Sequence, residues 1–324
     1  MKKRIAEKIR ESKTIAISSH IRPDADCIGS GIALTLMLEQ LGKNVSFRNT
    51  DRASFPLTEF PGFDRVEYKQ IYPDKFDIVI LMEGGSEDRH GQKNLSEYFT
   101  INIDHHVTSS TISDMNWIDT DASAVGELIF DLGNELDINF TPEMGFNLFA
   151  AIASDTGSFK YSNTSYRALE TASEIVKVSG VEPHSVSDLI FNSNPSEKIM
   201  LITKILSTLK FYHNKEIAFI FCRKDFLERG KIDDYDTEDI LSIVRSILGV
   251  KVVLFLKEIG NKLFRASLRS KGDFDASEIA GNFNGGGHGH AAGFFFEGEF
   301  GDAKKQILNV IYENLKEKKE YSGK

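Results

Sequence analysis

Three short segments of the sequence concentrate imidazole and carboxylate side chains. The first is His20-Ile-Arg-Pro-Asp-Ala-Asp26, the second is Asp104-His-His106, and the third contains Asp155. Each follows an apolar run, so these ligand-rich segments are expected to gather at one edge of a sheet. Imidazoles and carboxylates hold divalent cations, and two such ions roughly 3.5–4 Å apart activate a water for in-line attack at phosphorus. The spacing therefore indicates a metallohydrolase.

The first segment has a simpler alternative role. Asp24 or Asp26 alone could be the N-cap of the helix that follows. The combination with His20, with Pro23 restraining the backbone and with Gly-Ser-Gly at positions 29–31, favours a metal site. At a helix entry the two aspartates can diverge toward two different ions.

The second and third segments supply further ligands and candidate catalytic groups. Packing does not explain three consecutive polar residues, Asp104 to His106, at the end of a strand. Asp155 by itself is weak evidence for a metal site, because Asp-Thr-Gly turns are common. In extended backbone His106 faces away from the ligand His105. We therefore expect His106 to stabilise the phosphoryl oxygens or to protonate the leaving oxygen, and Asp104 to orient an imidazole.

The elements that position these residues alternate along the first half of the chain. Strands are expected over residues 14–19, 44–48, 77–82 and 99–103, and helices over residues 27–41 and 122–132, each followed by a glycine. This order predicts an α/β fold whose N-terminal domain is a doubly wound, mostly parallel sheet with helices on both faces. The ligand segments then lie in loops after strand carboxyl ends, where such sheets bind ligands.

The pattern changes after residue 194, with a helical stretch over residues 197–209 and a new strand over residues 216–222. We expect a catalytic metal-binding domain, a helical linker and a smaller α/β substrate-binding domain, with the active site in the cleft between the domains. The expected bounds are residues 1–190, 191–212 and 213–324.

Composition limits the partners and the compartment. A formal net charge of −9 argues against a long nucleic-acid footprint, since such surfaces are usually basic, but it allows small phosphorylated substrates. No apolar run approaches the roughly 18 residues of a membrane span, so we expect no membrane association and a cytoplasmic location. Cys27 and Cys222 are too few for a disulfide framework and are read as reduced thiols.

The second domain carries a candidate phosphate-binding surface. Alternation along residues 264–271 places Arg265, Ser267 and Arg269 on one face, which forms a cationic strand face. The alternative is a solvated edge strand protected by charge. Nearby, the run Gly285-Gly286-Gly287 gives a phosphate close access to backbone N–H groups, and His288 adds a donor.

Together these motifs resemble the DHH phosphoesterase superfamily, named for a string such as Asp104-His105-His106. The run Gly285-Gly-Gly-His288 with Ala291-Ala-Gly293 resembles the signature of the DHH-associated C-terminal domain. The chain is most similar to the branch of bifunctional oligoribonucleases and pAp phosphatases, or nanoRNases. The resemblance implies two divalent cations, usually Mn²⁺, with Mg²⁺ or Co²⁺ as alternatives. Mixed imidazole and carboxylate ligands suit these ions.

The resemblance also implies a division of the ligands. His20 and Asp24 would hold one ion, and the other would be held by Asp26, His105 and Asp155. The bridging carboxylate is expected in the loop after the third strand, where this chain has Glu83 instead of the usual aspartate. We expect Glu83 to bridge, the alternative being a helix-start carboxylate that touches no metal.

The implied activity is hydrolysis of short oligoribonucleotides and of 3′,5′-adenosine bisphosphate. The family assigns the Arg265–Arg269 strand and the glycine run to binding the nucleotide away from the scissile bond, and we add Arg89 as a substrate contact. Two alternatives stay open. The chain could hydrolyse linear or cyclic dinucleotides such as pApA and c-di-AMP, or it could be a nucleotide-binding regulatory protein with an impaired metal centre. A homodimer is also open.

Overall fold

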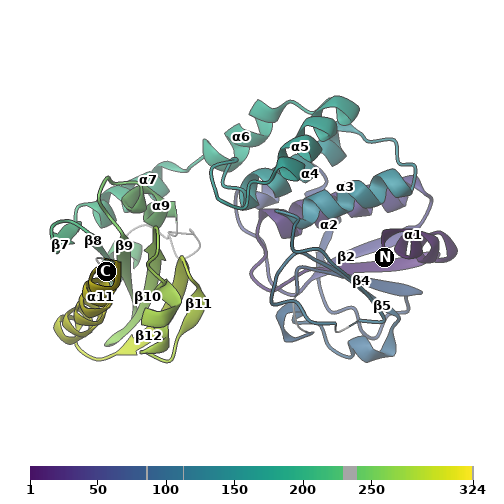
Figure 1. Cartoon of the computed structure of the whole chain (residues 1–324). Helices are drawn as coiled ribbons and strands as arrows, with labels where there is room; N and C mark the ends of the chain where they lie inside the picture. The colour runs from purple at the N-terminus through teal and green to yellow at the C-terminus, as the bar shows by residue number, and fades with distance from the viewer. Residues whose placement is uncertain (85–86, 112, 229–238, 323–324) are drawn as a thin grey trace. The chain divides into compact units, whose positions relative to one another are not determined.

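The chain folds into two compact units, Met1–Ser193 and Asn194–Lys324 (Figure 1). The computed structural model describes residues 1–84, 87–111, 113–228 and 239–322. Both units combine helices with a six-stranded sheet. The expected α/β class is therefore confirmed.

The first sheet is parallel throughout, with the strand order β3-β2-β1-β4-β5-β6. Its strands are β1 (Thr14–Ser18), β2 (Asn44–Asn49), β3 (Val66–Tyr68), β4 (Ile78–Met82), β5 (Thr100–Asp104) and β6 (Met115–Ile118). All five residues of β4 are buried, as expected for a strand covered on both faces. The order reverses between β1 and β4, so the loops after these two strands diverge at the switch point where such sheets bind ligands.

One face of this sheet carries the main core. Alternate strand residues such as Ile17, Ile80 and Ile103 pack against apolar side chains of the helices. The helices are α1 (Lys2–Glu11), α2 (Ala25–Gln40), α3 (Val125–Glu135), α4 (Pro142–Asp155), α5 (Tyr166–Ser179) and α6 (Pro183–Phe191). The helix α2 is central to this layer, because every residue from Ala25 to Leu38 is buried.

We expected helices on the other face of the sheet as well, but the structure covers this face differently. Ala16, Val79 and Leu81 pack against Ile71 and Leu95 in a smaller apolar cluster. Leu95 begins the short 3₁₀ helix η4 (Leu95–Glu97), and η3 (Glu87–His90) lies just before it in the chain. The connections on this side are thus built from turns and 3₁₀ segments in the described part of the chain.

The second unit has a mixed sheet in the order β11-β12-β10-β9-β8-β7. Only the β8–β9 pair is parallel among the described pairs. Its strands are β7 (Lys210–Tyr212), β8 (Ile217–Cys222), β9 (Val252–Gly260), β10 (Leu263–Ser270), β11 (Gly286–His288) and β12 (Ala291–Glu297). The strand β10 pairs with both β9 and β12. The alternative reading of the Arg265–Arg269 strand as an edge strand is therefore wrong.

Helices cover both faces of the second sheet. They are α7 (Ser196–Leu206), α8 (Lys224–Glu228), α9 (Asp239–Arg245), α10 (Ala276–Gly281) and α11 (Phe300–Ser322). The helix α7 lies in the stretch that we expected to link the domains, and it packs Leu201 and Ile205 into the core of this unit. Another cluster joins Ile307 and Ile311 of α11 to the opposite face of the sheet.

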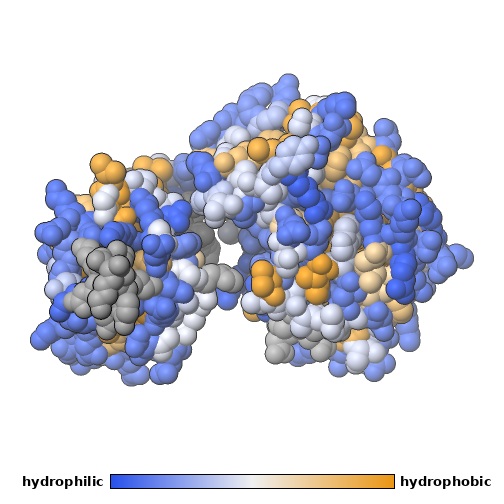
Figure 2. Space-filling view, viewed as in Figure 1, coloured by the Kyte–Doolittle hydropathy of each residue, from blue (hydrophilic) through white to orange (hydrophobic). Residues whose placement is uncertain are grey.

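The molecular surface is mostly polar on the face that Figure 2 shows, with apolar residues in scattered groups. No helix in the described ranges has the length and apolar character needed to cross a membrane.

Candidate metal centre

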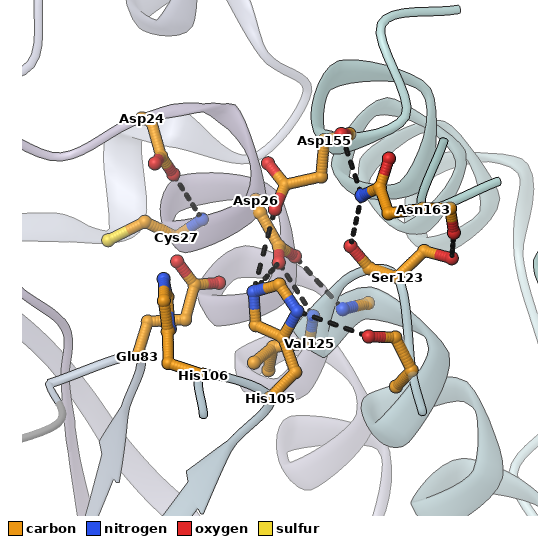
Figure 3. A network of polar contacts seen from close by, with 12 residues as sticks. Asp24, Asp26, Cys27, Glu83, His105, His106, Ser123, Val125, Asp155 and Asn163 are labelled. Carbon is orange, nitrogen blue, oxygen red and sulfur yellow. Dashed lines mark hydrogen bonds and ion pairs between the residues drawn. The ribbon is translucent and has the colours of Figure 1, made fainter. Parts of the chain in front are cut away.

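The predicted metal ligands converge at the carboxyl end of the first sheet, in two neighbouring groups. Figure 3 labels all of them except His20. Within each group, one potential ligand atom per residue lies within 4.8 Å of all the others. The first group is His20, Asp24, Cys27 and Glu83, and the second is Asp26, His105 and Asp155. All six ligands predicted from the sequence thus come together, and Cys27 joins them.

The backbone fold explains this convergence. His20 and Asp24 follow β1, Glu83 follows β4, and His105 follows β5, three strands that are neighbours in the parallel sheet. Carboxyl ends of parallel strands meet at the same edge, so loops far apart in sequence bring their side chains to one place. Asp155 arrives separately, as the last residue of α4.

The ring of His20 is oriented by its own neighbour. Its Nδ1 lies 2.8 Å from the carbonyl oxygen of Ile21, which leaves Nε2 facing the carboxylates, 3.5 Å from Asp24 Oδ2 and 3.5 Å from Glu83 Oε2. Burial lowers the pKa of His20, but the interactions with Asp24 and with Cys27 outweigh burial and raise this pKa to about 11. The surroundings of Nε2 therefore favour positive charge, which a metal cation would also supply.

Glu83 is buried with an unpaired oxygen. The residue is 1% exposed, and its Oε1 has no hydrogen-bond partner among the residues that the structure describes. Burial, and then the charges of Asp26 and Asp24, raise its pKa well above the ordinary value. An orphaned buried oxygen beside like charges is costly unless a cation is present. The donor set of this position thus fits a divalent ion.

Asp26 lies in the first turn of α2, and its carboxylate is held against the start of α3. Its carboxylate accepts hydrogen bonds from the backbone N–H groups of Val125, at 2.6 Å, and Gly126, at 2.9 Å. The hydroxyl of Ser30 donates a third, at 2.8 Å. Asp26 is fully buried, and these donors compensate a carboxylate that is removed from water.

His105 completes the second group. Its Nδ1 lies 3.2 Å from the carbonyl oxygen of Ala122, and its Nε2 lies 3.5 Å from Asp155 Oδ2 and 4.0 Å from Asp26 Oδ2. This Nε2 is buried without a hydrogen-bond partner in the described ranges. A carbonyl that fixes one ring nitrogen while the other faces carboxylates is a common arrangement around metal-binding histidines.

Asp155 reaches the site because α4 packs closely on α2. A Cβ at Gly29 of α2 would lie 2.5 Å from the carbonyl oxygen of Asn147 in α4, so the absence of a side chain permits this approach. The amide of Asn163 donates to the backbone carbonyl of Asp155 at 3.1 Å, as Figure 3 shows. Burial and the charges of Asp26 and Asp24 raise the pKa of Asp155 well above its ordinary value.

Asp104 and His106 form a pair beside the metal groups. Asp104 Oδ1 accepts hydrogen bonds from the backbone N–H groups of His105, at 2.7 Å, and His106, at 3.0 Å, and lies 2.8 Å from Nδ1 of His106. Burial raises the pKa of Asp104, but the hydrogen bonds of His106 outweigh it and hold this pKa well below the usual range. The carboxylate therefore stays ionised. Because Asp104 contacts Nδ1 of His106, the other ring nitrogen, Nε2, takes no part in this pair.

The predicted substrate residues of the second unit share one sheet. Register places Ser267 of β10 opposite Gly293 of β12, which in turn lies opposite Gly286 of β11. Along β10, Arg265 is exposed, Arg269 is half-buried and Ser267 is buried. The cationic strand and the glycine run thus occupy three adjacent strands.

The glycine run has a structural role as well. A Cβ at Gly285 would overlap the backbone of Gly293, and one at Gly287, where φ is +145°, would overlap that of Ala291. The backbone of His288 lies in β11, but its side chain is outside what the structure describes. Arg89, the remaining candidate, is exposed in η3, and its carbonyl accepts a hydrogen bond from the N–H of Ile21 at 2.7 Å.

Sequence reasoning missed two buried residues near the metal groups. Cys27 follows Asp26 directly, but only the loop geometry places its sulfur beside His20 and Glu83. His90 is fully buried, and a Cβ at Gly84 would overlap its ring. Burial lowers the pKa of His90 to about 4, so this imidazole is neutral at neutral pH. No motif in the sequence marks either residue.

Comparison with known proteins finds a family match in each of the two units. Residues 14–152 match the DHH family, N-terminal domain, and residues 206–317 match the DHHA1 domain. The bifunctional oligoribonuclease and PAP phosphatase NrnA of Thermus thermophilus is 27% identical over 314 residues, which are 93% of this chain and 90% of that protein. Its namesake from Bacillus subtilis is 29% identical over 302 residues, 90% of this chain and 92% of that protein.

A solved structure shows the same fold over the whole chain. It is the crystal structure of an exopolyphosphatase-related protein from Bacteroides fragilis, with a TM-score of 0.88 and 24% identity. The match covers 100% of this chain and 97% of that one.

Proposed function

Because this chain belongs to the DHH family, with a DHHA1 domain after its DHH domain, we propose that it hydrolyses short oligoribonucleotides and 3′,5′-adenosine bisphosphate. The chain is a metal-dependent phosphoesterase. The observation that carries the proposal is the pair of ligand groups at the carboxyl end of the first sheet. The names of the two NrnA relatives support the substrate class.

The proposed centre holds two divalent cations, with Mn²⁺ as the expected ion. His20 and Asp24 would hold one, Asp26, His105 and Asp155 would hold the other, and Glu83 would serve both. Such ions act as Lewis acids toward phosphoryl oxygens and lower the pKa of the attacking water. The backbone carbonyls at Nδ1 of both histidines leave Nε2 facing the carboxylates, where it could serve as a ligand.

The remaining residues supply the proton and bind the substrate. His106, oriented through Nδ1 by Asp104, stabilises the phosphoryl oxygens or protonates the leaving oxygen from Nε2. Arg89, Arg265, Ser267 and Arg269 bind the nucleotide, together with backbone donors of residues 285–288. A phosphate held by an arginine gains charge-assisted hydrogen bonds of defined geometry.

Short RNAs and nucleotides are the proposed partners, without a long nucleic-acid footprint. A homodimer and a cytoplasmic location complete the proposal. Size-exclusion chromatography with light scattering tests the first, and cell fractionation tests the second.

A substrate panel tests the proposed activity. The purified chain is incubated with Mn²⁺ and with 3′,5′-adenosine bisphosphate, di- to pentaribonucleotides, pApA and c-di-AMP, and products are separated by chromatography. We expect turnover of the bisphosphate and of the short RNAs, and its loss in excess chelator. Turnover confined to dinucleotides, or turnover that survives prolonged dialysis against chelator, would contradict the proposal.

A further inference from the structure

We propose that Cys27 is a ligand of the metal position formed by His20, Asp24 and Glu83, and that this position accepts a thiophilic divalent ion such as Co²⁺, Fe²⁺ or Zn²⁺. The inference rests on the proposed metal centre and deepens it. It adds a sulfur donor to a set for which the sequence predicts only nitrogen and oxygen.

The position of the sulfur is the first observation. Cys27 lies in the first turn of α2, where its backbone N–H donates to Asp24 Oδ1 at 3.0 Å. Its Sγ is within 4.8 Å of the ligand atoms of His20, Asp24 and Glu83, and the side chain is fully buried. Figure 3 shows the sulfur beside the carboxylates of Asp24 and Glu83.

The unpaired oxygen of Glu83 is an independent second observation. Glu83 is 1% exposed, and its Oε1 has no hydrogen-bond partner in the described part of the chain. A buried carboxylate oxygen that is aimed into a group of ligands requires a donor or a cation. The sulfur of Cys27 therefore faces a space that is built for a positive charge.

Cys222 shows what a purely structural cysteine looks like in this chain. It is also fully buried, but it packs among apolar side chains such as Ile220 and Leu241 in the core of the second unit. Free cysteines of this kind behave as small hydrophobic residues. Cys27 is surrounded instead by an imidazole and two carboxylates.

The added sulfur changes which ions the position prefers. Thiolate and imidazole donors favour Co²⁺, Fe²⁺ and Zn²⁺, whereas carboxylates and water suit Mg²⁺. The thiol gives its proton to solvent as the bond from Sγ to the metal forms, as is general for cysteine ligands. Among the described residues the second group has no sulfur donor, so the two positions differ in selectivity.

The second group contains two carboxylates and one imidazole, from Asp26, Asp155 and His105. This composition is harder than that of the first group. We therefore expect Co²⁺ or Cd²⁺ to enter the position of Cys27 before Mg²⁺ or Mn²⁺ does.

Absorption spectroscopy of the cobalt-loaded chain tests this inference without relying on activity. The metal-free chain is titrated with Co²⁺, and the near-ultraviolet charge-transfer band of a thiolate bound to cobalt is recorded. We expect the band in the wild type and in the matched control Cys222→Ser, and its loss in Cys27→Ser. In competition with Mn²⁺, Cys27→Ser should lower the relative affinity for Cd²⁺ by at least about tenfold.

The outcomes separate this inference from the proposed function. A wild-type chain that binds Co²⁺ by elemental analysis but shows no thiolate band would overturn the role of Cys27 and leave the metal centre intact. That measurement needs no variant, so misfolding of Cys27→Ser cannot obscure it. A chain that binds no divalent ion would instead overturn the proposed function.

Discussion

Glu83 combines backbone strain with a buried charge. Its φ of 56° lies in the left-handed region, which costs a residue with a side chain about 1–3 kcal/mol. Its carboxylate is buried beside two aspartates that raise its pKa. Both costs are understandable if a cation holds the carboxylate in the centre of the cluster. Strain of this kind is concentrated at functional sites.

Substituting Glu83 tests the bridging role that we propose for it. Glu83→Gln removes the charge at nearly constant volume, so we expect metal content and kcat to fall together. Glu83→Asp keeps the carboxylate and should retain substantial activity. Elemental analysis and turnover of 3′,5′-adenosine bisphosphate measure the two effects. Wild-type metal content and rate in Glu83→Gln would show that the centre forms without this residue.

The Asp104–His106 pair leads to a second prediction. If His106 acts on the phosphoryl group in the transition state, His106→Ala should lower kcat by about 10²–10⁴-fold and leave metal content unchanged. Asp104→Asn, which disturbs the orientation of the ring, should lower kcat less. His184→Ala is the matched control, because the side chain of His184 is 72% exposed near Glu182. A change confined to KM would argue against a role in the transition state.

At the residue scale, ligand types were predictable and their surroundings were not. Imidazoles and carboxylates after strands indicated His20, Asp26 and His105 from the sequence alone. Cys27 could not be recognised, because the direction of its side chain depends on the turn into α2. The ring of His90 packs against Gly84. No local sequence pattern predicts this contact.

At the scale of elements, the contact between α2 and α4 determines where Asp155 lies. Asp26 stands in the first turn of α2, and Asp155 is the last residue of α4. The two carboxylates reach the same His105 only while the helices remain close. At Gly29 the backbone of α4 lies so near that it leaves no room for a Cβ.

Gly29→Ala should therefore impair the second ligand group. The new Cβ would meet the carbonyl oxygen of Asn147 at 2.5 Å, and overpacking of this kind typically costs about 1–3 kcal/mol. We expect a lower Tm and the loss of about one bound metal ion per chain. The control is Gly281→Ala, where a Cβ meets nothing within 4 Å. Equal metal content in both variants would show that the helix spacing does not set the position of Asp155.

The elements themselves were predicted where hydrophobic patterns are long. The four predicted strands of the first unit correspond to β1, β2, β4 and β5, and the two predicted helices to α2 and α3. The short strands β3 (Val66–Tyr68) and β6 (Met115–Ile118) were not predicted. Each has one buried residue, so the alternation that marks a strand is too short to recognise.

At the scale of the whole molecule, the clustered charges couple folding to pH in the metal-free chain. The pKa of Glu83 is raised well above the ordinary value of 4.5, by burial and by the neighbouring aspartates. A carboxyl whose pKa is higher in the folded chain binds more protons when folded. Its contribution to stability is therefore fully present below pH 4.5 and is lost as the pH rises through the raised pKa.

His20 acts in the same direction over a higher range. Its pKa is raised from 6.5 to about 11, so its contribution is complete below pH 6.5 and is lost as the pH rises toward 11. Metal binding displaces these protons and becomes stronger as the pH rises. We expect the Tm difference between the metal-loaded and the chelator-treated chain to increase with pH. A difference that stays constant in thermal melts across this range would contradict the assignment of these groups as ligands.

The division of the chain into two units allows binding to be separated from chemistry. The metal groups belong to Met1–Ser193, and Arg269 belongs to Asn194–Lys324. The alternation of residue types predicted the cationic face of β10. It could not predict that β10 lies inside the sheet, because the pairing of β10 with β9 and β12 depends on distant residues. A central strand holds its side chains more rigidly than an edge strand would.

Arg269→Ala tests whether the second unit binds a phosphate that is not hydrolysed. A charge-assisted hydrogen bond contributes about 1.5–3 kcal/mol, so we expect kcat/KM for 3′,5′-adenosine bisphosphate to fall roughly ten- to a hundredfold. Metal content should not change. Arg223→Ala is the matched control, since Arg223 is 57% exposed and pairs with Asp225. A minimal aryl phosphodiester, which lacks the second phosphate, should lose much less. A contact between Arg269 and the remote phosphate would affect only the substrate that carries this phosphate. Equal losses on both substrates would therefore mean that Arg269 supports the reacting centre or the fold.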